Sequence, residues 1–299
     1  DFIDDINCYA SEVITVSCQN FDGQIRYLSK RYGIISLSEL ISCLKENRNI
    51  PKNTLVITFD DGYMDNYTNA YPILKKYGAT ATFYITAGCI EDRKALWMHK
   101  VIYMVRNTKL QEIEINGAIF NMRDRKIAER EITSMIKRRR QGDRDEFIGD
   151  IAKRLGVTFA KEKFEGILMK WENIVEMEKD GFSFGSHTMN HPNLPNSSSH
   201  DAMYELMESK KIIEKRLSHS PEHFSYPNGG AETHYNEEVK EMVRKGGYFS
   251  ATTSVAGIVD KKSDLYELRR NGVSKGVKLY ALSTEIVFEK LNWWLMGGR

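Results

Sequence analysis

Two short motifs hold the side chains with the clearest potential for chemistry. The carboxylates Asp60 and Asp61 follow an apolar run at 54–59, and the imidazoles His187 and His191 stand four residues apart much later in the chain. Two histidines and one carboxylate are a common ligand set for a catalytic zinc ion with an open water position. The same ligands also suit iron, cobalt, nickel or manganese. With one carboxylate left over to accept a proton, the set predicts a metal-assisted hydrolase.

The carboxylate pair stands at the end of a predicted strand. Residues 54–59 are mostly β-branched or aromatic, which favours a buried strand, and Gly62 permits a tight turn directly after the pair. Ligands of α/β folds bind at this carboxyl edge of the sheet, where the two side chains would point in different directions. A solvated Asp-Asp-Gly turn is the alternative, and the motif alone does not separate the two interpretations.

The histidine pair follows a second predicted strand, at 181–186. Residues four apart lie on one face of a helix, so His187 and His191 could both point at one ion. Pro192 would end such a helix after a single turn. The alternative is a pair of surface histidines in a polar loop.

Both motifs resemble those of a known family. Thr58-Phe-Asp-Asp-Gly62 and His187-Thr-Met-Asn-His191 are similar to the first two motifs of the polysaccharide deacetylases, also called the NodB-homology or carbohydrate esterase 4 family. The resemblance extends over 21–272. It implies an α/β fold of the distorted (β/α) barrel type. It also implies a metal-dependent hydrolase that removes an N-acetyl group from an amino sugar in a surface polysaccharide or its precursor.

The resemblance assigns a role to each residue of the two motifs. Asp60 would be the general base, and Asp61, His187 and His191 would bind one divalent ion, with zinc the first choice. A metal lowers the pKa of its water and polarises the amide carbonyl, which agrees with this division of roles.

A third motif is suggested by the loop at 224–229. Phe224-Ser-Tyr-Pro-Asn-Gly229 resembles the family's third motif, and this makes the backbone N–H of Asn228 the expected oxyanion donor. An ordinary turn is the alternative, because Pro, Asn and Gly all favour turns. The side chains expected to contact substrate are Tyr63, Trp97, Tyr226, Pro227 and Arg270.

The chain departs from the family pattern in two places. Ser225 stands where an Arg usually orients the base, and no histidine follows His234, so the usual late general acid is missing. A branch of the family found among surface-polysaccharide biosynthesis proteins combines a Tyr-Pro-x-Gly loop with a late Arg. By this likeness Arg269 or Arg270 would contact Asp60. His234, metal-bound water and Asp60 itself remain candidates for the proton donor.

These departures keep other functions open. The same site could act as a deformylase or an O-deacetylase on a different acyl group. The chain could also be a carbohydrate-binding relative that kept the metal ligands and lost turnover. Acyl release that depends on Asp60 separates the enzymes from the binding protein.

Strands and helices alternate along most of the chain, which indicates parallel strands in one domain over 1–299. A charged segment at about 90–168 interrupts this alternation and predicts an inserted helical cap over the site. Its Trp97 either lines a substrate pocket or packs in a core, and the segment could instead dock another protein. Expected helices are 21–30, 36–44, 67–77, 125–140, 145–155, 172–180, 200–217 and 237–246, and expected strands are 55–59, 80–85, 182–185, 223–226 and 249–253.

Composition limits the classes of partner. The net charge is only +2 over 299 residues, and the cluster Arg138-Arg-Arg140 has no aromatic platform beside it. We therefore expect no nucleic acid and interpret the cluster as a solvated helix face, with a phosphate-bearing sugar donor as its second possible use. The apolar tail at about 280–299 predicts a helix that packs on the barrel or forms a homo-oligomer contact.

The cysteines and the apolar runs bear on the expected compartment. Cys8, Cys18, Cys43 and Cys89 show no paired spacing, and the chain has no membrane-length apolar run and no signal peptide. These features favour a cytoplasmic protein without a transmembrane segment, with membrane association as an option. An upstream signal or anchor stays open because the chain starts at Asp1 without Met.

Overall fold

The computed structural model describes residues 16–273. The helical tail expected at 280–299 lies outside these residues. The centre is a parallel sheet that curls into a half-barrel, with strand order β3-β4-β7-β8-β9. The expected α/β fold of the NodB type is thereby confirmed. The strands are β3 (Thr58–Phe59), β4 (Thr82–Ile85), β7 (Ser183–Ser186), β8 (His223–Ser225) and β9 (Ser250–Thr252).

The strand expected at 55–59 is two short strands in different sheets. Its first part, β2 (Thr54–Leu55), pairs in parallel with β1 (Gly33–Ile34), and its second part is β3, which pairs with β4. The carbonyl of Leu55 accepts from the N–H of Ile35, and the carbonyl of Ile57 accepts from the N–H of Thr82. The chain therefore changes partner between the two strands, which a hydrophobic run cannot reveal.

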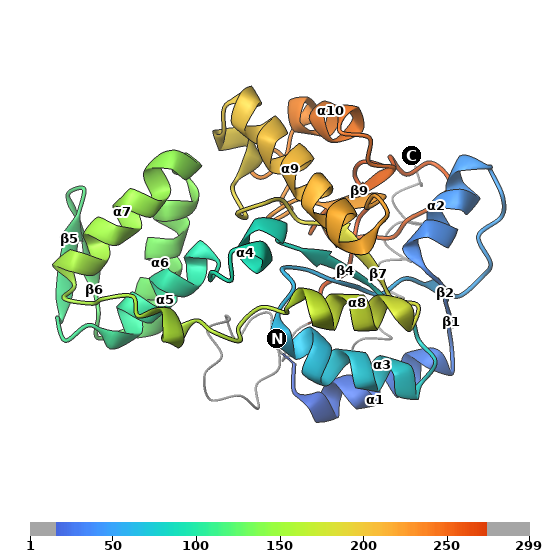
Figure 1. The fold of residues 1–299 in the computed structure, drawn as a ribbon, viewed down its shortest axis with the longest axis horizontal. Helices are drawn as coiled ribbons and strands as arrows, with labels where there is room; N and C mark the ends of the chain where they lie inside the picture. Colours follow the sequence, from blue (N-terminus) through green and yellow to red (C-terminus); the bar gives the residue numbers. More distant parts are fainter. Residues whose placement is uncertain (1–15, 274–299) are drawn as a thin grey trace, which may run out of the picture.

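Helices cover both faces of the sheet. Figure 1 shows α1, α3 and α8 on one side and α9 and α10 on the other. Serine caps begin several of them: the Ser36 hydroxyl accepts from the N–H of Glu39, and the Ser198 hydroxyl accepts from the N–H of Asp201. The barrel helices are α1 (Cys18–Ser29), α2 (Leu37–Lys45), the π-helix η2 (Asn66–Ala70), α3 (Tyr71–Lys76), α4 (Ala87–Glu91), α8 (Trp171–Lys179), the 3-10 turn η4 (Leu194–Asn196), α9 (Ser199–Leu217) and α10 (Glu237–Lys245).

Aromatic side chains fix the ends of the strands that lead into the site. Phe59 stacks on Phe83 with ring centroids 4.7 Å apart, and Phe83 stacks on Phe184 at 5.7 Å. The three residues sit side by side in the strand register of β3, β4 and β7. Such cross-strand pairs stabilise a sheet beyond the area they bury, so the residue just before Asp60 is held in place.

The insertion has a hydrophobic core of its own. Val101, Ile132 and Ile151 are fully buried in a cluster formed within this segment. Figure 1 shows its helices beside the barrel, at one end of the molecule. Its elements are α5 (Trp97–Asn107), β5 (Glu112–Ile115), β6 (Ala118–Asn121), α6 (Arg125–Lys137), α7 (Gln141–Arg154) and the 3-10 turn η3 (Lys161–Lys163).

The insertion contains helices, as expected, and also a β-hairpin that was not expected. β5 and β6 form an antiparallel hairpin whose turn, Asn116-Gly117, has positive φ angles of 53° and 80°. Asn-Gly is the strongest short sequence signature of such a turn, so the hairpin was visible in the sequence.

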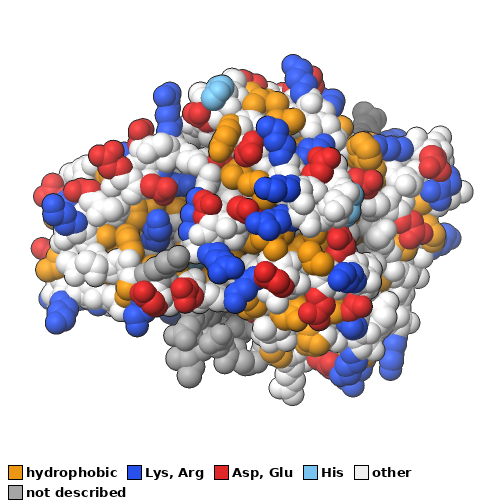
Figure 2. All heavy atoms as spheres, viewed as in Figure 1, with side chains coloured by type: hydrophobic (Ala, Val, Ile, Leu, Met, Phe, Trp, Pro, Cys, Tyr) orange, Lys and Arg blue, Asp and Glu red, His pale blue; other side chains and the backbone are white. Residues whose placement is uncertain are grey.

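The described surface carries both signs of charge. On the face drawn in Figure 2, Lys and Arg side chains are interspersed with Asp and Glu. No helix within residues 16–273 combines the length and the apolar character that a bilayer crossing requires.

One buried histidine of the sheet predicts a pH-dependent stability. His223 is 3% exposed, and its ring nitrogens lie 2.9 Å from the hydroxyls of Ser38 and Ser250. Burial, with a smaller effect of Lys45, lowers the pKa of His223 to about 4. The half-exposed Glu222, 3.6 Å away, does not reverse this shift.

We predict that protonation of His223 destabilises the fold in acid. The unfolded chain takes up this proton first, so stability is lost as the pH falls from 6.5 toward 4. The free energy of unfolding from this group should fall by up to about 3 kcal/mol. Denaturant melts across this range should show a shallower pH dependence for His223→Gln. The same change at the exposed His200 should leave the slope unchanged, and equal slopes for all three proteins would contradict the assignment.

Candidate metal centre

The residues of all three motifs come together at the carboxyl edge of the sheet. Asp60 and Asp61 follow β3, His187 follows β7 directly, and Asn228 lies in the loop after β8. Arg270 follows Leu268, which forms a parallel bridge with Thr252 of β9. Residues more than 200 positions apart in sequence therefore share one edge.

Three ligand atoms converge at this edge. The Asp61 Oδ1 lies 3.4 Å from the Nε2 of His187 and 3.2 Å from the Nε2 of His191. All three potential ligand atoms lie within 4.8 Å of one another, and both imidazoles are buried. The structure thus groups the three residues that the sequence assigned to a metal.

The histidines do not lie on a helical turn, so that expectation is wrong. Thr188 and His191 have positive φ angles of 69° and 53°, and the segment between them is an irregular loop. The hydroxyl of Thr188 accepts from the N–H of His191 at 3.0 Å and closes this loop. Left-handed backbone is uncommon outside glycine, which is why periodicity could not predict it.

The turn at Asp61 and Gly62 also has left-handed backbone. Asp61 has φ 73° and Gly62 has φ 83°. A side chain at position 62 would also lie about 3.1 Å from Ile85 and Ile90, so the position is both strained and crowded for other residues. The turn directs Asp61 toward the histidine loop while Asp60 remains beside the sheet.

The donor set fits a divalent cation. The Nδ1 of His187 lies 2.7 Å from the carbonyl of Ser225, which can only accept, so this nitrogen carries the proton and Nε2 is left as a free electron pair. The buried Asp61 Oδ1 makes no hydrogen bond within residues 16–273. A bound cation would satisfy these buried acceptor atoms, which face one another without a donor between them.

The electrostatics of the triad, which we define as Asp61, His187 and His191, agree with an ionised carboxylate. Burial opposes the charge on Asp61, but the two imidazoles outweigh it and hold the pKa of Asp61 well below its usual range. Burial also lowers the pKa of His191, whereas Asp61 and Asp60 overcome burial at His187 and raise its pKa. At neutral pH the site therefore offers a carboxylate and at least one neutral imidazole.

Asp60 is paired with a late arginine. The Arg270 guanidinium donates to both oxygens of Asp60, at 2.8 and 2.7 Å, and also to Thr58 and to the carbonyl of Thr253. Arg269 is exposed, so of the two expected arginines Arg270 makes this contact. Burial would raise the pKa of Asp60, yet the charge and hydrogen bonds of Arg270 outweigh it and lower that pKa.

The loop after β8 is held rigidly against Ser254. The Ser254 hydroxyl donates to the carbonyl of Asn228 at 2.7 Å, and its N–H donates to the carbonyl of Gly229 at 3.0 Å. A side chain at Gly229 would come within 2.4 Å of the Ser254 nitrogen, so only glycine fits there. Within the described part of the chain the N–H of Asn228 makes no hydrogen bond, as an oxyanion donor requires. Its catalytic role stays a prediction.

Most side chains expected to contact substrate are buried and bonded to protein. The hydroxyl of Tyr63 lies 3.0 Å from the Nε2 of His99, and the hydroxyl of Tyr226 donates to the carbonyl of Tyr266. Trp97 donates its indole N–H to the carbonyl of His191, and Pro227 is also buried. Their contacts with substrate stay predictions, and so does that of Arg270.

Sequence reasoning missed three residues that support the site. His99 contacts Tyr63, and the buried pair Arg144 and Glu205 binds the backbone of the histidine loop. None of the three stands in a motif, and all meet the site only through tertiary packing. Burial cannot be seen in a sequence, and Arg144 stands just before the helix expected at 145–155, so no sequence signal pointed to them.

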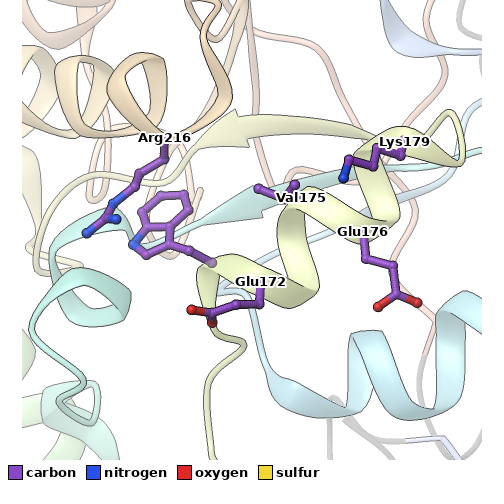
Figure 3. Close-up of a pocket in the computed structure, with 6 residues that line it drawn as sticks. Glu172, Val175, Glu176, Lys179 and Arg216 are labelled. Atoms are coloured by element: carbon purple, nitrogen blue, oxygen red, sulfur yellow. The ribbon is translucent and has the colours of Figure 1, made fainter.

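A separate hollow lies away from this site. Figure 3 shows it along α8, and it contains none of the predicted catalytic, metal or substrate residues. Two of its lining side chains, Trp171 and Arg216, donate to Glu91. The lining residues are Trp171, Glu172, Val175, Glu176, Lys179 and Arg216.

Comparison with protein families supports the resemblance drawn from the motifs. A family model described as Polysaccharide deacetylase matches residues 47–250. The Bacillus subtilis protein YxkH is 23% identical over 265 residues, which cover 88% of this chain and 67% of that protein. The poly-beta-1,6-N-acetyl-D-glucosamine N-deacetylase of Staphylococcus aureus is 39% identical over 104 residues, and this match spans only 34% of each chain.

Solved structures share the fold. The Streptococcus pyogenes deacetylase PplD, solved in complex with acetate, superposes with a TM-score of 0.64 at 22% identity, covering 93% of this chain and 89% of that one. IcaB from Ammonifex degensii superposes with a TM-score of 0.57 at 17% identity, covering 91% and 90%. The curled parallel sheet therefore belongs to a fold found in solved deacetylases.

Loss of one imidazole should abolish metal binding. We predict that His191→Ala weakens binding of a divalent ion by more than the roughly 10–100-fold that loss of an outer partner typically costs. Metal content by mass spectrometry after loading and dialysis measures this directly. His200→Ala is the matched control, since that side chain is 91% exposed. Equal metal content in all three proteins would place the ion elsewhere.

Proposed function

The chain belongs to the polysaccharide deacetylase family, and from that premise we propose that it is a metal-dependent hydrolase of N-acetylated amino sugars. The family makes it a hydrolase acting on amide bonds. One observation supports metal dependence: Asp61, His187 and His191 lie together. A second carboxylate, Asp60, lies beside them and is bound to Arg270.

The two neighbouring carboxylates are suited to different tasks. Asp61 has the two imidazoles as its nearest ionisable partners, which suits a ligand. Asp60 is held by two hydrogen bonds from Arg270, which leaves it to the proton transfer. A bound divalent cation, for which zinc is our first choice, would lower the pKa of a water molecule and polarise the acetyl carbonyl.

Asp60 can complete the proton balance alone. As general base it accepts a proton from the attacking water, whose oxygen bonds to the acetyl carbon. The carbon–nitrogen bond then breaks, and the proton held by Asp60 passes to the leaving nitrogen, giving an amine and acetic acid, which ionises to acetate in water. The N–H of Asn228 would donate to the oxyanion formed between these steps.

His234 is the second candidate for the proton donor. Its Nδ1 accepts from the N–H of Gly230 at 3.0 Å, so its proton sits on Nε2. Burial, with smaller effects of Lys137 and His191, lowers the pKa of His234 to about 4. A neutral imidazole at working pH can donate a hydrogen bond to the leaving group. We keep Asp60 as the proposed proton donor because it already holds the proton taken from the attacking water.

We base the proposed substrate class on the relatives. The named Staphylococcus aureus relative acts on poly-β-1,6-N-acetyl-D-glucosamine, but it aligns over a third of each chain. We propose an N-acetylated hexosamine in a polysaccharide or its precursor. A deformylase or O-deacetylase, or a binding protein without turnover, remains the alternative, and the next two experiments separate them.

Asp60→Asn should remove activity and keep the metal. We expect acetate release from N-acetylglucosamine oligomers to fall by roughly 10²–10⁴-fold, the usual contribution of a general base. Metal content should stay at the wild-type level because Asp60 is not a ligand. Asp92→Asn, a side chain 59% exposed, is the control. Undiminished turnover in Asp60→Asn would remove Asp60 from the mechanism, and absence of acyl release in the wild type would favour a binding protein.

Arg270→Lys should shift the acidic limb of the pH–rate profile. Arg270 holds down the pKa of Asp60, so its loss raises that pKa, and activity should be lost at a higher pH than in the wild type. Lysine keeps the charge but not the paired hydrogen bonds. The profile of kcat/KM measures the shift, and the exposed neighbour Arg269→Lys is the control. An unmoved acidic limb would contradict the role given to Arg270.

A further inference from the structure

The insertion contacts the barrel through the backbone of a metal ligand. The indole N–H of Trp97 donates to the carbonyl of His191 at 3.0 Å. Arg144 of α7 donates to the same carbonyl at 3.3 Å and to the carbonyl of Asn190 at 3.1 Å. Two side chains from different helices of the insertion thus converge on one peptide unit of the histidine loop.

Arg144 is an unusual residue to bury. It is 3% exposed, and no carboxylate lies within ion-pair distance of it among residues 16–273. Burial lowers its pKa, and its Nε makes no hydrogen bond in the described chain. An apolar side chain would fill this space without the cost of desolvating a cation, so packing alone does not account for an arginine.

The histidine loop is held from its other side by an opposite charge. Glu205 of α9, 1% exposed, accepts from the backbone N–H groups of Met189 and Asn190 at 2.8 and 2.9 Å, and from the Asn190 side chain. A buried anion therefore binds the loop's N–H groups while the buried cation Arg144 binds its carbonyls. Each charge is compensated through the peptide units between them.

This arrangement holds a backbone that is unfavourable by itself. His191 must adopt a left-handed conformation to bring its Nε2 within 3.2 Å of Asp61. Side-chain donors on its carbonyl fix the orientation of that peptide unit, and the orientation of the peptide fixes where the imidazole points.

Further contacts of the insertion also reach the site loops. His99 of α5 bonds the hydroxyl of Tyr63, two residues after Asp61, and Asn196 donates to the carbonyl of Lys137 at 3.4 Å. The insertion has its own hydrophobic cluster, so these polar contacts lie between two separately packed units. The contact of His99 reaches the loop that supplies Asp61, whereas Asn196 lies in η4, just after the histidine loop.

We propose that the insertion is a working part of the metal site, in which Trp97 and Arg144 are positioning residues that orient His191. Because docking of the insertion and ordering of the ligand loop use the same contacts, each stabilises the other, and metal binding stabilises both. The inference rests on the metal site of the proposed function, and it does not depend on which acyl group is removed.

Cobalt binding tests the proposal without relying on turnover. Trp97→Phe removes the indole N–H and part of the ring that lies 5.0 Å from the Arg144 guanidinium. Arg144→Met removes both donor groups and keeps an unbranched chain. Arg130→Met, exposed on α6 of the same insertion, is the matched control. We expect the affinity for Co²⁺, followed by its visible absorption, to fall roughly 10–100-fold in Arg144→Met, and less in Trp97→Phe. Both spectra should differ from the wild type, because the coordination geometry changes, and Arg144→Lys should fall between wild type and Arg144→Met.

The possible outcomes separate this inference from the proposed function. Wild-type binding together with unchanged affinity and spectrum in both variants would overturn the inference and leave the metal site standing. A wild type that binds no cobalt or zinc would overturn both. If Arg144→Met does not fold, as judged by its melting temperature without metal, Trp97→Phe decides, because it removes a single donor from the same carbonyl.

Discussion

A buried carboxylate that faces two imidazoles imposes the constraint on which the rest of this structure depends. Asp61 and the two histidines come from loops more than 120 residues apart, yet their ligand atoms lie within 4.8 Å of one another. A parallel sheet solves the first part of this problem, because β3 and β7 flank β4 and end at the same edge. The remaining distance is closed by left-handed residues on both loops.

Those strained residues need support, and the support comes from charges outside the triad. Glu205 binds N–H groups of the histidine loop and Arg144 binds its carbonyls, and Arg270 performs a similar task for Asp60. Arg270 also explains how the chain tolerates Ser225 where the family usually has an arginine. Its guanidinium reaches Asp60 from the far end of the sequence and lies 3.2 Å from the Ser225 hydroxyl. The positive partner of the base is retained, while its position in the sequence has changed.

The sequence predicted which residues meet at the site better than the backbone that brings them together. The motif residues followed from residue types and spacing, whereas the arginine partner of Asp60 followed from the family resemblance, which left Arg269 and Arg270 open. Periodicity failed for the histidine pair, since a helical turn and a left-handed loop can both bring residues four apart to one point. It also failed at 55–59, where the chain changes partner between two sheets. The supporting roles of Arg144 and Glu205 could not be predicted, because they arise only when α7 and α9 pack against the same loop.

Anomalous diffraction from crystals soaked in zinc would test the central claim most directly. The account predicts one strong peak bound by Asp61, His187 and His191 at about 2.0–2.2 Å, with Asp60 still paired to Arg270 and outside the coordination shell. A peak coordinated by Asp60, or one at a different group of residues, would contradict the assignment of ligand and base on which the mechanism rests.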